Sequence, residues 1–162
     1  MVEKKGQLQM SFSMMFSIIL IIAFVGVAIY AITTFLSIGK CGQIGLYYND
    51  LQGEVDKAWQ GEISRSVFEA AIPSGIESVC FGNLTQRVSQ DAREEYRSLV
   101  RYTNSKENIF MFPQNKACDN QLASTRIEHA VADEFFCVAK QNGKVEVRLV
   151  KEEGENEVSF SR

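Results

Sequence analysis

The chain has 162 residues, of which 46% are hydrophobic, and a formal net charge of −3. Residues 40–162 hold 15 Lys and Arg against 19 Asp and Glu, and no basic run exceeds two residues. This charge pattern argues against a nucleic acid partner, and the length allows one modest domain.

The N-terminal part of the chain contains an unbroken run of 25 uncharged residues, 12–36. As a helix this run is ~37 Å long, enough to cross a hydrocarbon core of about 30 Å. It is too long for the apolar core of a cleaved secretory signal, and nothing resembling a cleavage site follows Leu36. We therefore predict a transmembrane helix over 12–38, embedded in membrane lipid, after an N-terminal or signal segment over 1–11.

The charges that flank this helix predict its orientation. Lys4, Lys5 and the amino terminus precede the run, whereas Lys40 is followed mainly by acidic residues. By the positive-inside rule the N-terminus lies in the cytoplasm and residues 40–162 lie outside the cell membrane.

All four cysteines follow the predicted membrane helix, at Cys41, Cys80, Cys118 and Cys137. In a small extracytoplasmic domain they predict two disulfides, with three possible connectivities. The pair Cys80–Cys137 is favoured because both residues lie in predicted strands, which leaves Cys41–Cys118. Two alternatives are a zinc site, disfavoured by spacings of 39, 38 and 19 residues, and four buried free thiols.

Beyond the membrane, apolar residues continue at helical spacing from Ile44 to Ala58, which predicts a helix extension over 39–60. After Gly61 the apolar period changes to two. The pattern then predicts strands at 67–72, 76–81 and 108–112, a helix over 90–102, and a loop over 114–121.

The Asn142-Gly143 pair lies between two alternating apolar runs, 135–140 and 144–151. This arrangement predicts a type I′ hairpin that pairs Val138 with Val147 and Phe136 with Leu149. A last strand is expected near 158–160. The predicted fold class is α+β: one long helix, one short helix, and five or six mainly antiparallel strands in a head over 61–162.

No motif in the chain supplies the converging polar groups of an active site. The single histidine, His129, is interpreted as structural. We therefore predict no enzymatic activity, no cofactor or metal, and no small-molecule substrate. The Asn83-Leu84-Thr85 sequon predicts a glycan at Asn83 if the head faces a glycosylating compartment.

The N-terminal sequence K-K-G-Q-L-Q-M-S-F leads directly into the apolar run. It resembles archaeal type IV pilin precursors with class III signal peptides, and it is also similar to uncharacterised small archaeal single-pass membrane proteins. The pilin resemblance implies cleavage between Gly6 and Gln7, with the apolar helix kept as anchor and assembly surface. The family's serine and glutamate, two and four positions after the glutamine, are Gln9 and Ser11 here.

Two functions are therefore expected from the sequence. In the first, the chain is a pilin-like structural subunit, in the cell membrane or an extracellular filament, that packs against itself or sister subunits. The small residues of the apolar run would shape that contact: Ser13, Ser17, Gly26 and Ala28. The alternative is a solitary membrane-tethered domain that binds an external partner.

Overall fold

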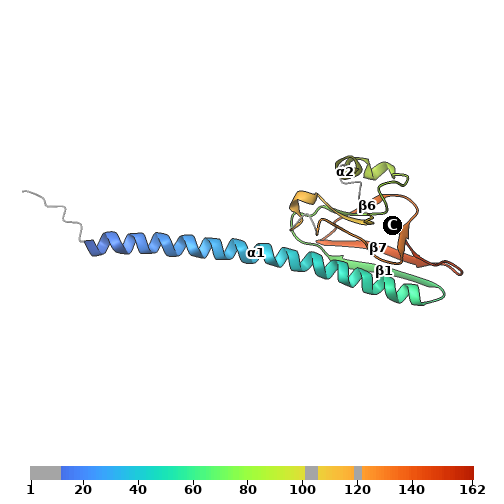
Figure 1. Cartoon of the computed structure of the whole chain (residues 1–162), viewed down its shortest axis with the longest axis horizontal. Helices are drawn as coiled ribbons and strands as arrows, with labels where there is room; N and C mark the ends of the chain where they lie inside the picture. Colours follow the sequence, from blue (N-terminus) through green and yellow to red (C-terminus); the bar gives the residue numbers. More distant parts are fainter. Residues whose placement is uncertain (1–11, 101–105, 119–121) are drawn as a thin grey trace, which may run out of the picture. The chain divides into compact units, whose positions relative to one another are not determined.

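The structure, a computed structural model, describes residues 12–100, 106–118 and 122–162. Helix α1 spans Phe12–Gln60, 49 residues, so the predicted membrane helix and its extension form one helix by hydrogen bonding. The chain divides into two compact units, Met1–Ser37 and Ile38–Arg162. The second half of α1 therefore belongs to the same unit as the strands (Figure 1).

The second half of α1 forms because its apolar residues recur every three or four positions and bury one face. The buried residues of this face are Ile44, Tyr47, Tyr48, Leu51, Val55 and Ala58. At the end of the helix, the Lys151 ammonium group donates hydrogen bonds to the carbonyl oxygens of Trp59 and Gly61. A cation at this position also interacts favourably with the helix dipole, so Lys151 stabilises the C-terminus of α1.

The strands form two four-stranded sheets. The first has the order β1-β7-β8-β5 and comprises Ser64–Ala71, Lys144–Lys151, Val158–Ser161 and Ala130–Ala132. The second has the order β4-β3-β2-β6 and comprises Ser124–Thr125, Ile109–Phe112, Ser78–Phe81 and Phe136–Ala139. Neighbouring strands are antiparallel except β5 and β8, so the predicted α+β class is confirmed.

The predicted turn at Asn142-Gly143 forms, but the predicted pairing of its flanking strands is wrong. Positive φ angles of 50° and 84° at these two residues are those of a type I′ turn. Beyond the turn the strands separate into different sheets: Val138 lies opposite Val79, and Val147 lies opposite Phe68. Neither Val138–Val147 nor Phe136–Leu149 forms, because β7 instead pairs along all eight of its residues with β1.

The predicted second helix, over 90–102, forms in two parts within the described residues. A 3-10 turn, η1 (Gln90–Ala92), leads into α2 (Arg93–Leu99), and residues 101–105 lie outside the described part. The predicted loop contains a 3-10 turn, η3 (Gln114–Lys116). Strands β4 and β5 have two and three residues, too few for an alternating pattern to reveal them, which accounts for the underestimated number of strands.

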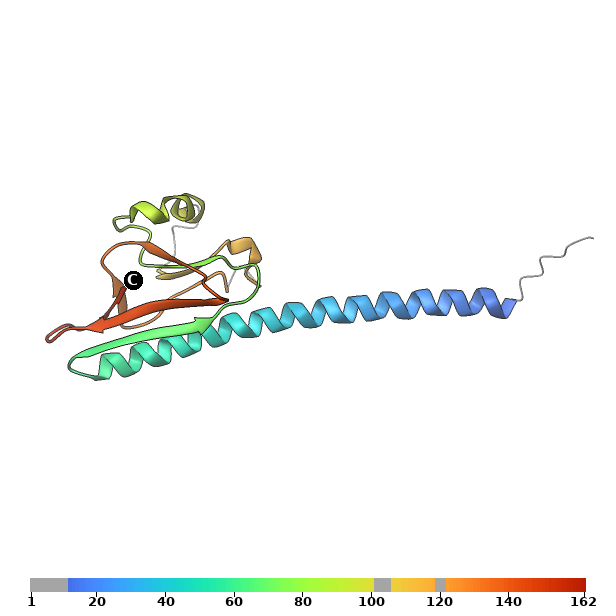
Figure 2. The same ribbon diagram turned by 180° about the vertical axis from the view of Figure 1, so that it is seen from behind.

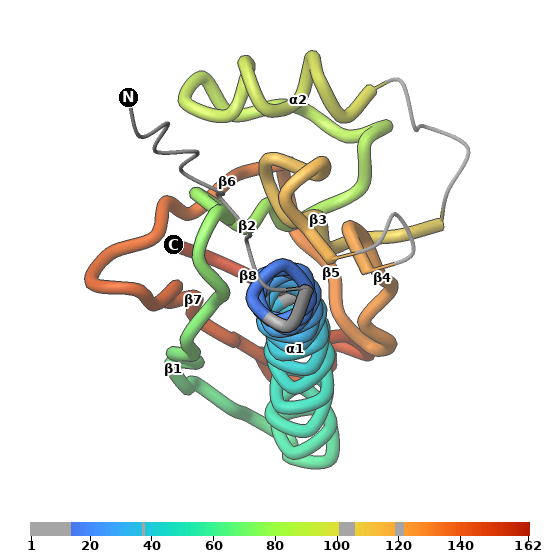
Figure 3. Tube along the Cα trace, turned by 90° about the vertical axis from the view of Figure 1, so that its left-hand side faces the viewer, coloured from blue at the N-terminus to red at the C-terminus, as the bar shows by residue number. Residues whose placement is uncertain are grey.

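The head has two hydrophobic clusters, one on each face of the second sheet. The larger cluster joins the buried face of α1 to both sheets, and the smaller includes Ala92 and Leu99 of the η1 and α2 segment. Figures 2 and 3 show α2 and the second half of α1 on opposite sides of the second sheet. Along β2, Val79 and Phe81 belong to the larger cluster, whereas Cys80 belongs to the smaller. All four residues of β2 are buried because both faces of this strand are covered.

Candidate membrane anchor and assembly surface

The first half of α1 exposes apolar side chains all around the helix. Residues 14–36 are exposed throughout, including Phe24 at 71% and Ile22 at 66%. Within the described ranges, α1 is the one helix that is long and apolar enough to cross a membrane. A continuous apolar surface of this size is unfavourable in water and is typical of helices that lie in lipid or pack against other chains.

The small residues of this half do not lie on a single face. Each residue turns the helix by about 100°, which puts Ser17 and Ala28 within about 20° of each other. By the same rotation Gly26 lies on the opposite side. A Cβ atom added to Gly26 meets no atom within 4 Å, so this side is open in the single chain. The side chain of Ser13 lies outside the described part, as do Gly6 and Gln7.

Two disulfides close the head, in the connectivity that the sequence favoured. Cys41–Cys118 joins α1 to the segment after η3 across a sequence separation of 77 residues. Cys80–Cys137 joins β2 to β6, whose register places these residues opposite each other, across 57 residues. Both bridges lie within the unit Ile38–Arg162, and they use every cysteine of the chain.

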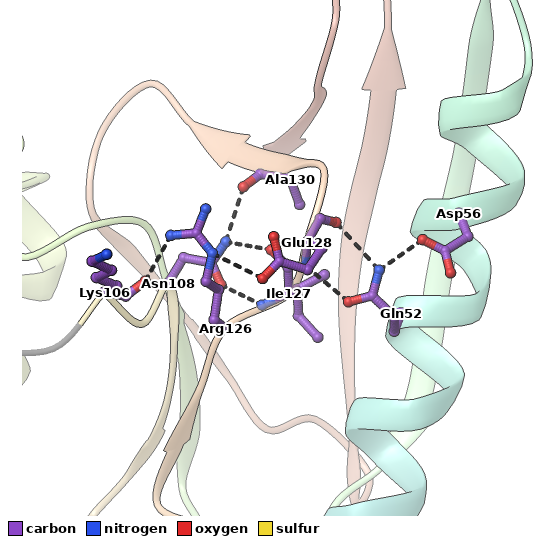
Figure 4. Close-up of polar contacts among 8 residues, drawn as sticks. All are labelled: Gln52, Asp56, Lys106, Asn108, Arg126, Ile127, Glu128 and Ala130. Atoms are coloured by element: carbon purple, nitrogen blue, oxygen red, sulfur yellow. Dashed lines mark hydrogen bonds and ion pairs between the residues drawn. The ribbon is translucent and has the colours of Figure 1, made fainter.

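A polar network holds the segment that follows β4 against α1 (Figure 4). The Gln52 side-chain amide donates to the Glu128 carbonyl at 3.2 Å and accepts from the Glu128 N–H at 2.9 Å. The Asn108 amide donates to the carbonyls of Ile127 and Ala130, both at 2.9 Å, and accepts from the Ile127 N–H at 2.8 Å. These two side-chain amides form hydrogen bonds with backbone groups of an irregular segment, where a strand would use bonds to a neighbouring strand. The network therefore serves to hold the fold together.

His129 follows this network and packs against the chain's single tryptophan. Its ring stacks on Trp59 with centroids 3.8 Å apart and an interplanar angle of 12°. The Trp59 indole N–H donates to the Asn156 carbonyl at 2.9 Å. His129 is exposed and has a φ of 61°, and its ring contact links its segment to the end of α1.

Two tyrosines near the start of the buried part of α1 lie in the core. Burial raises the pKa of Tyr47, and burial together with the neighbouring Tyr47 and Glu107 raises the pKa of Tyr48. The Tyr48 hydroxyl donates to the Leu122 carbonyl at 2.9 Å. Both phenols therefore stay neutral at physiological pH, as buried tyrosines of a packed core do.

The sequon residue Asn83 is exposed in the turn that follows β2. Its side-chain oxygen accepts hydrogen bonds from the Thr85 N–H at 3.0 Å and the Thr85 hydroxyl at 3.1 Å. Leu84 between them is buried and anchors the turn. Asn83 is thus at the surface, and its glycosylation stays a prediction.

A hollow of about 490 Å³ lies between β6 and β7, which separate on either side of the turn that connects them. Its lining pairs Lys144 with Glu69 at 3.0 Å and Arg162 with Asp91 at 2.8 Å. Its cysteine, Cys137, is in a disulfide, and the lining includes no histidine. In the part of the chain that the structure describes, no group of three or more His, Cys, Asp or Glu residues could hold a metal ion.

Comparisons with known proteins found no match. No protein-family model, no curated protein and no solved structure matches the chain.

Proposed function

We propose that this chain is a single-pass membrane protein whose first helical half is the anchor and whose head lies outside the cytoplasm. The observation that carries this proposal is the exposed apolar surface along residues 14–36 of α1. The two disulfides support an extracytoplasmic head, since such bridges persist in oxidising compartments. The excess of positive charge before the helix supports the same orientation.

We further propose that the anchor assembles with copies of itself or with sister subunits, as in type IV pilins. The K-K-G-Q start supports this reading, and Gln9 and Ser11, in place of the family's serine and glutamate, separate the chain from the usual pattern. A solitary tethered domain is the second candidate. It is favoured by the distribution of Gly26 and Ser17 over opposite sides of the helix, which gives no single face of small residues.

Orientation and processing are tested in the protein's own host. Protease added outside intact cells is expected to remove the head and to spare residues before the anchor. Mass determination of the mature N-terminus is expected to find Gln7 as the first residue. A protected head contradicts the orientation, and an intact Met1–Gly6 segment supports a plain anchor instead of a processed pilin-like subunit.

Assembly through the helix is tested by replacing Gly26 with leucine. A Cβ atom at this position meets nothing within 4 Å in the single chain, so we expect the larger side chain to act through a neighbouring chain. We expect crosslinking between copies in native membranes to fall several-fold while insertion is unchanged, because small residues allow close helix approach. Val25→Leu, which enlarges an adjacent exposed side chain, is the control. Unchanged crosslinking in Gly26→Leu favours the solitary domain.

A further inference from the structure

Strand β1 is a long edge strand whose outer side has no partner among the described strands. The sheet order places β1 at one end, beside β7 (Figure 1). The register with β7 covers Ser64 to Ala71. The Ile72 N–H donates to the Gly143 carbonyl at 3.1 Å. The backbone N–H and C=O groups of the even-numbered residues of β1 therefore point toward β7. By the antiparallel alternation, the N–H and C=O groups of the odd-numbered residues point away from the sheet. Such an edge is a template for another strand.

The exposed face of β1 has a symmetric arrangement of side chains about Val67. Val67 is 56% exposed, and Arg65 and Glu69 lie two residues before and after it, also exposed. Ile63, 59% exposed, lies four residues before Val67, and the small residue Ala71 lies four residues after it. If a second, identical strand runs in the opposite direction with its Val67 opposite this one, Arg65 of each strand lies opposite Glu69 of the other.

We propose that β1 pairs with β1 of a second copy of this chain, antiparallel and about a twofold axis at Val67. In this register Val67 faces the partner's Val67, and Arg65 faces the partner's Glu69. Opposite charges directly across two strands are stabilising. Registers centred on Arg65 or Glu69 would oppose like charges, and registers centred on Ser66 or Phe68 would form no pair of opposite charges. The charges therefore favour the register centred on Val67.

The existing ion pairs of the head extend this complementarity. Arg65 pairs with Glu152 at 2.8 Å, and Lys144 pairs with Glu69 at 3.0 Å, all with half or more of the side chain exposed. In the proposed pair the charges run Glu152, Arg65, the partner's Glu69, the partner's Lys144. They alternate in sign across the interface, which forms a network instead of isolated surface pairs.

A groove of about 580 Å³ lies beside this edge, between β1 and the second half of α1. Gly53 and Val67 both line it, so the proposed axis passes near Gly53. Gly53 has open space where a Cβ would be, which lets a second helix approach. Asp50 and Lys57 line the groove on either side of Gly53, and the reversal brings Asp50 toward the partner's Lys57.

The twofold axis also determines how the two copies are oriented. β1 runs back along the second half of α1, from the end at Gln60 toward Ile38 (Figures 1 and 2). Reversal of β1 therefore reverses this part of α1, and the two Ile38 ends point in opposite directions. Because each anchor is joined to its head at Ile38, the two anchors are connected to the pair at opposite ends, which suits copies on two membranes that face each other. This orientation rests on the proposed anchor, whereas the strand pairing does not.

The test uses the full chain in lipid vesicles with heads on the outer surface, and it measures vesicle tethering by light scattering. Wild-type vesicles are expected to tether. Arg65→Glu and Glu69→Arg are each expected to slow tethering about tenfold or more, because each opposes two like-charge pairs. A mixture of the two variant vesicles is expected to tether again, since acidic residues at both positions then face arginines. Flotation of the chain with the vesicles checks anchoring separately.

Matched controls separate strand pairing from general charge effects. Arg126→Glu and Glu128→Arg reverse an exposed ion pair away from β1, and each is expected to tether like wild type. Val67→Pro removes an outward N–H while leaving the ladder to β7, so it is expected to abolish tethering, whereas Val67→Thr retains it. Absence of tethering by wild type, normal tethering by either charge variant at β1, or failure of the mixture would overturn the proposal.

Discussion

Replacement of Leu51 with alanine is expected to lower the free energy of unfolding of the head by about 2–5 kcal/mol. Leu51 is fully buried on the inner face of α1, within the cluster that joins the helix to both sheets. The loss comes from the transfer of the removed methyl groups and from the cavity that they leave. Chemical denaturation followed by the fluorescence of Trp59, the single tryptophan, measures it.

The matched control for this change is Leu46→Ala in the same helix. Leu46 is 62% exposed and lies five residues before Leu51, so its truncation removes little packing. We expect its effect to stay within about 0.5 kcal/mol. Equal effects of the two substitutions would show that the second half of α1 does not pack into the head as described.

Loss of either disulfide is expected to lower the free energy of unfolding by about 4 kcal/mol. In the chain-entropy account, bridges across 77 and 57 residues restrict the unfolded chain to nearly the same extent. The paired variants are Cys41→Ala with Cys118→Ala, and Cys80→Ala with Cys137→Ala. The second variant is expected to lose more, because Cys80 is fully buried beneath α2 and alanine leaves a gap there.

Thermal unfolding in the absence of reductant measures both losses, and peptide mapping of the non-reduced protein checks the connectivity. Reductant is expected to lower the free energy of unfolding of the wild type. It should not change the free energy of unfolding of a variant in which all four cysteines are alanine, because that variant has no disulfide to reduce. Free thiols in freshly isolated protein, or a loss below about 1 kcal/mol in both variants, would contradict a structural role for the bridges.

The proposed head pairing and the proposed anchor assembly make different demands on the same chain. Anchor assembly uses the first half of α1, whereas the proposed pairing uses the edge of the head at β1. The charge variants at Arg65 and Glu69 therefore leave Gly26-dependent crosslinking unchanged if both proposals hold, and Gly26→Leu leaves vesicle tethering unchanged. These two measurements separate the surfaces.

Several features followed from the sequence alone, because short stretches of chain carry them. The uncharged run over residues 12–36 predicts a long apolar helix by composition and length. Asn142-Gly143 predicts a type I′ turn because both residues tolerate a positive φ. The spacing of the cysteines disfavours a zinc site, and the placement of Cys80 and Cys137 in predicted strands favoured the pairing that forms.

Other features were decided by contacts between segments that are distant in the chain. The strands that flank Gly143 separate because β7 finds an eight-residue partner in β1, and no local pattern encodes that preference. Likewise, nothing in the sequence distinguishes Asn108 from other residues at strand ends. Its role in binding the backbone of residues 126–130 appears only in the folded structure. Arg65 and Glu69 read as ordinary surface charges in the sequence. Their symmetry about Val67 matters because the tertiary structure leaves that edge of β1 without a partner among the described strands, a property of the whole sheet and not of the strand itself.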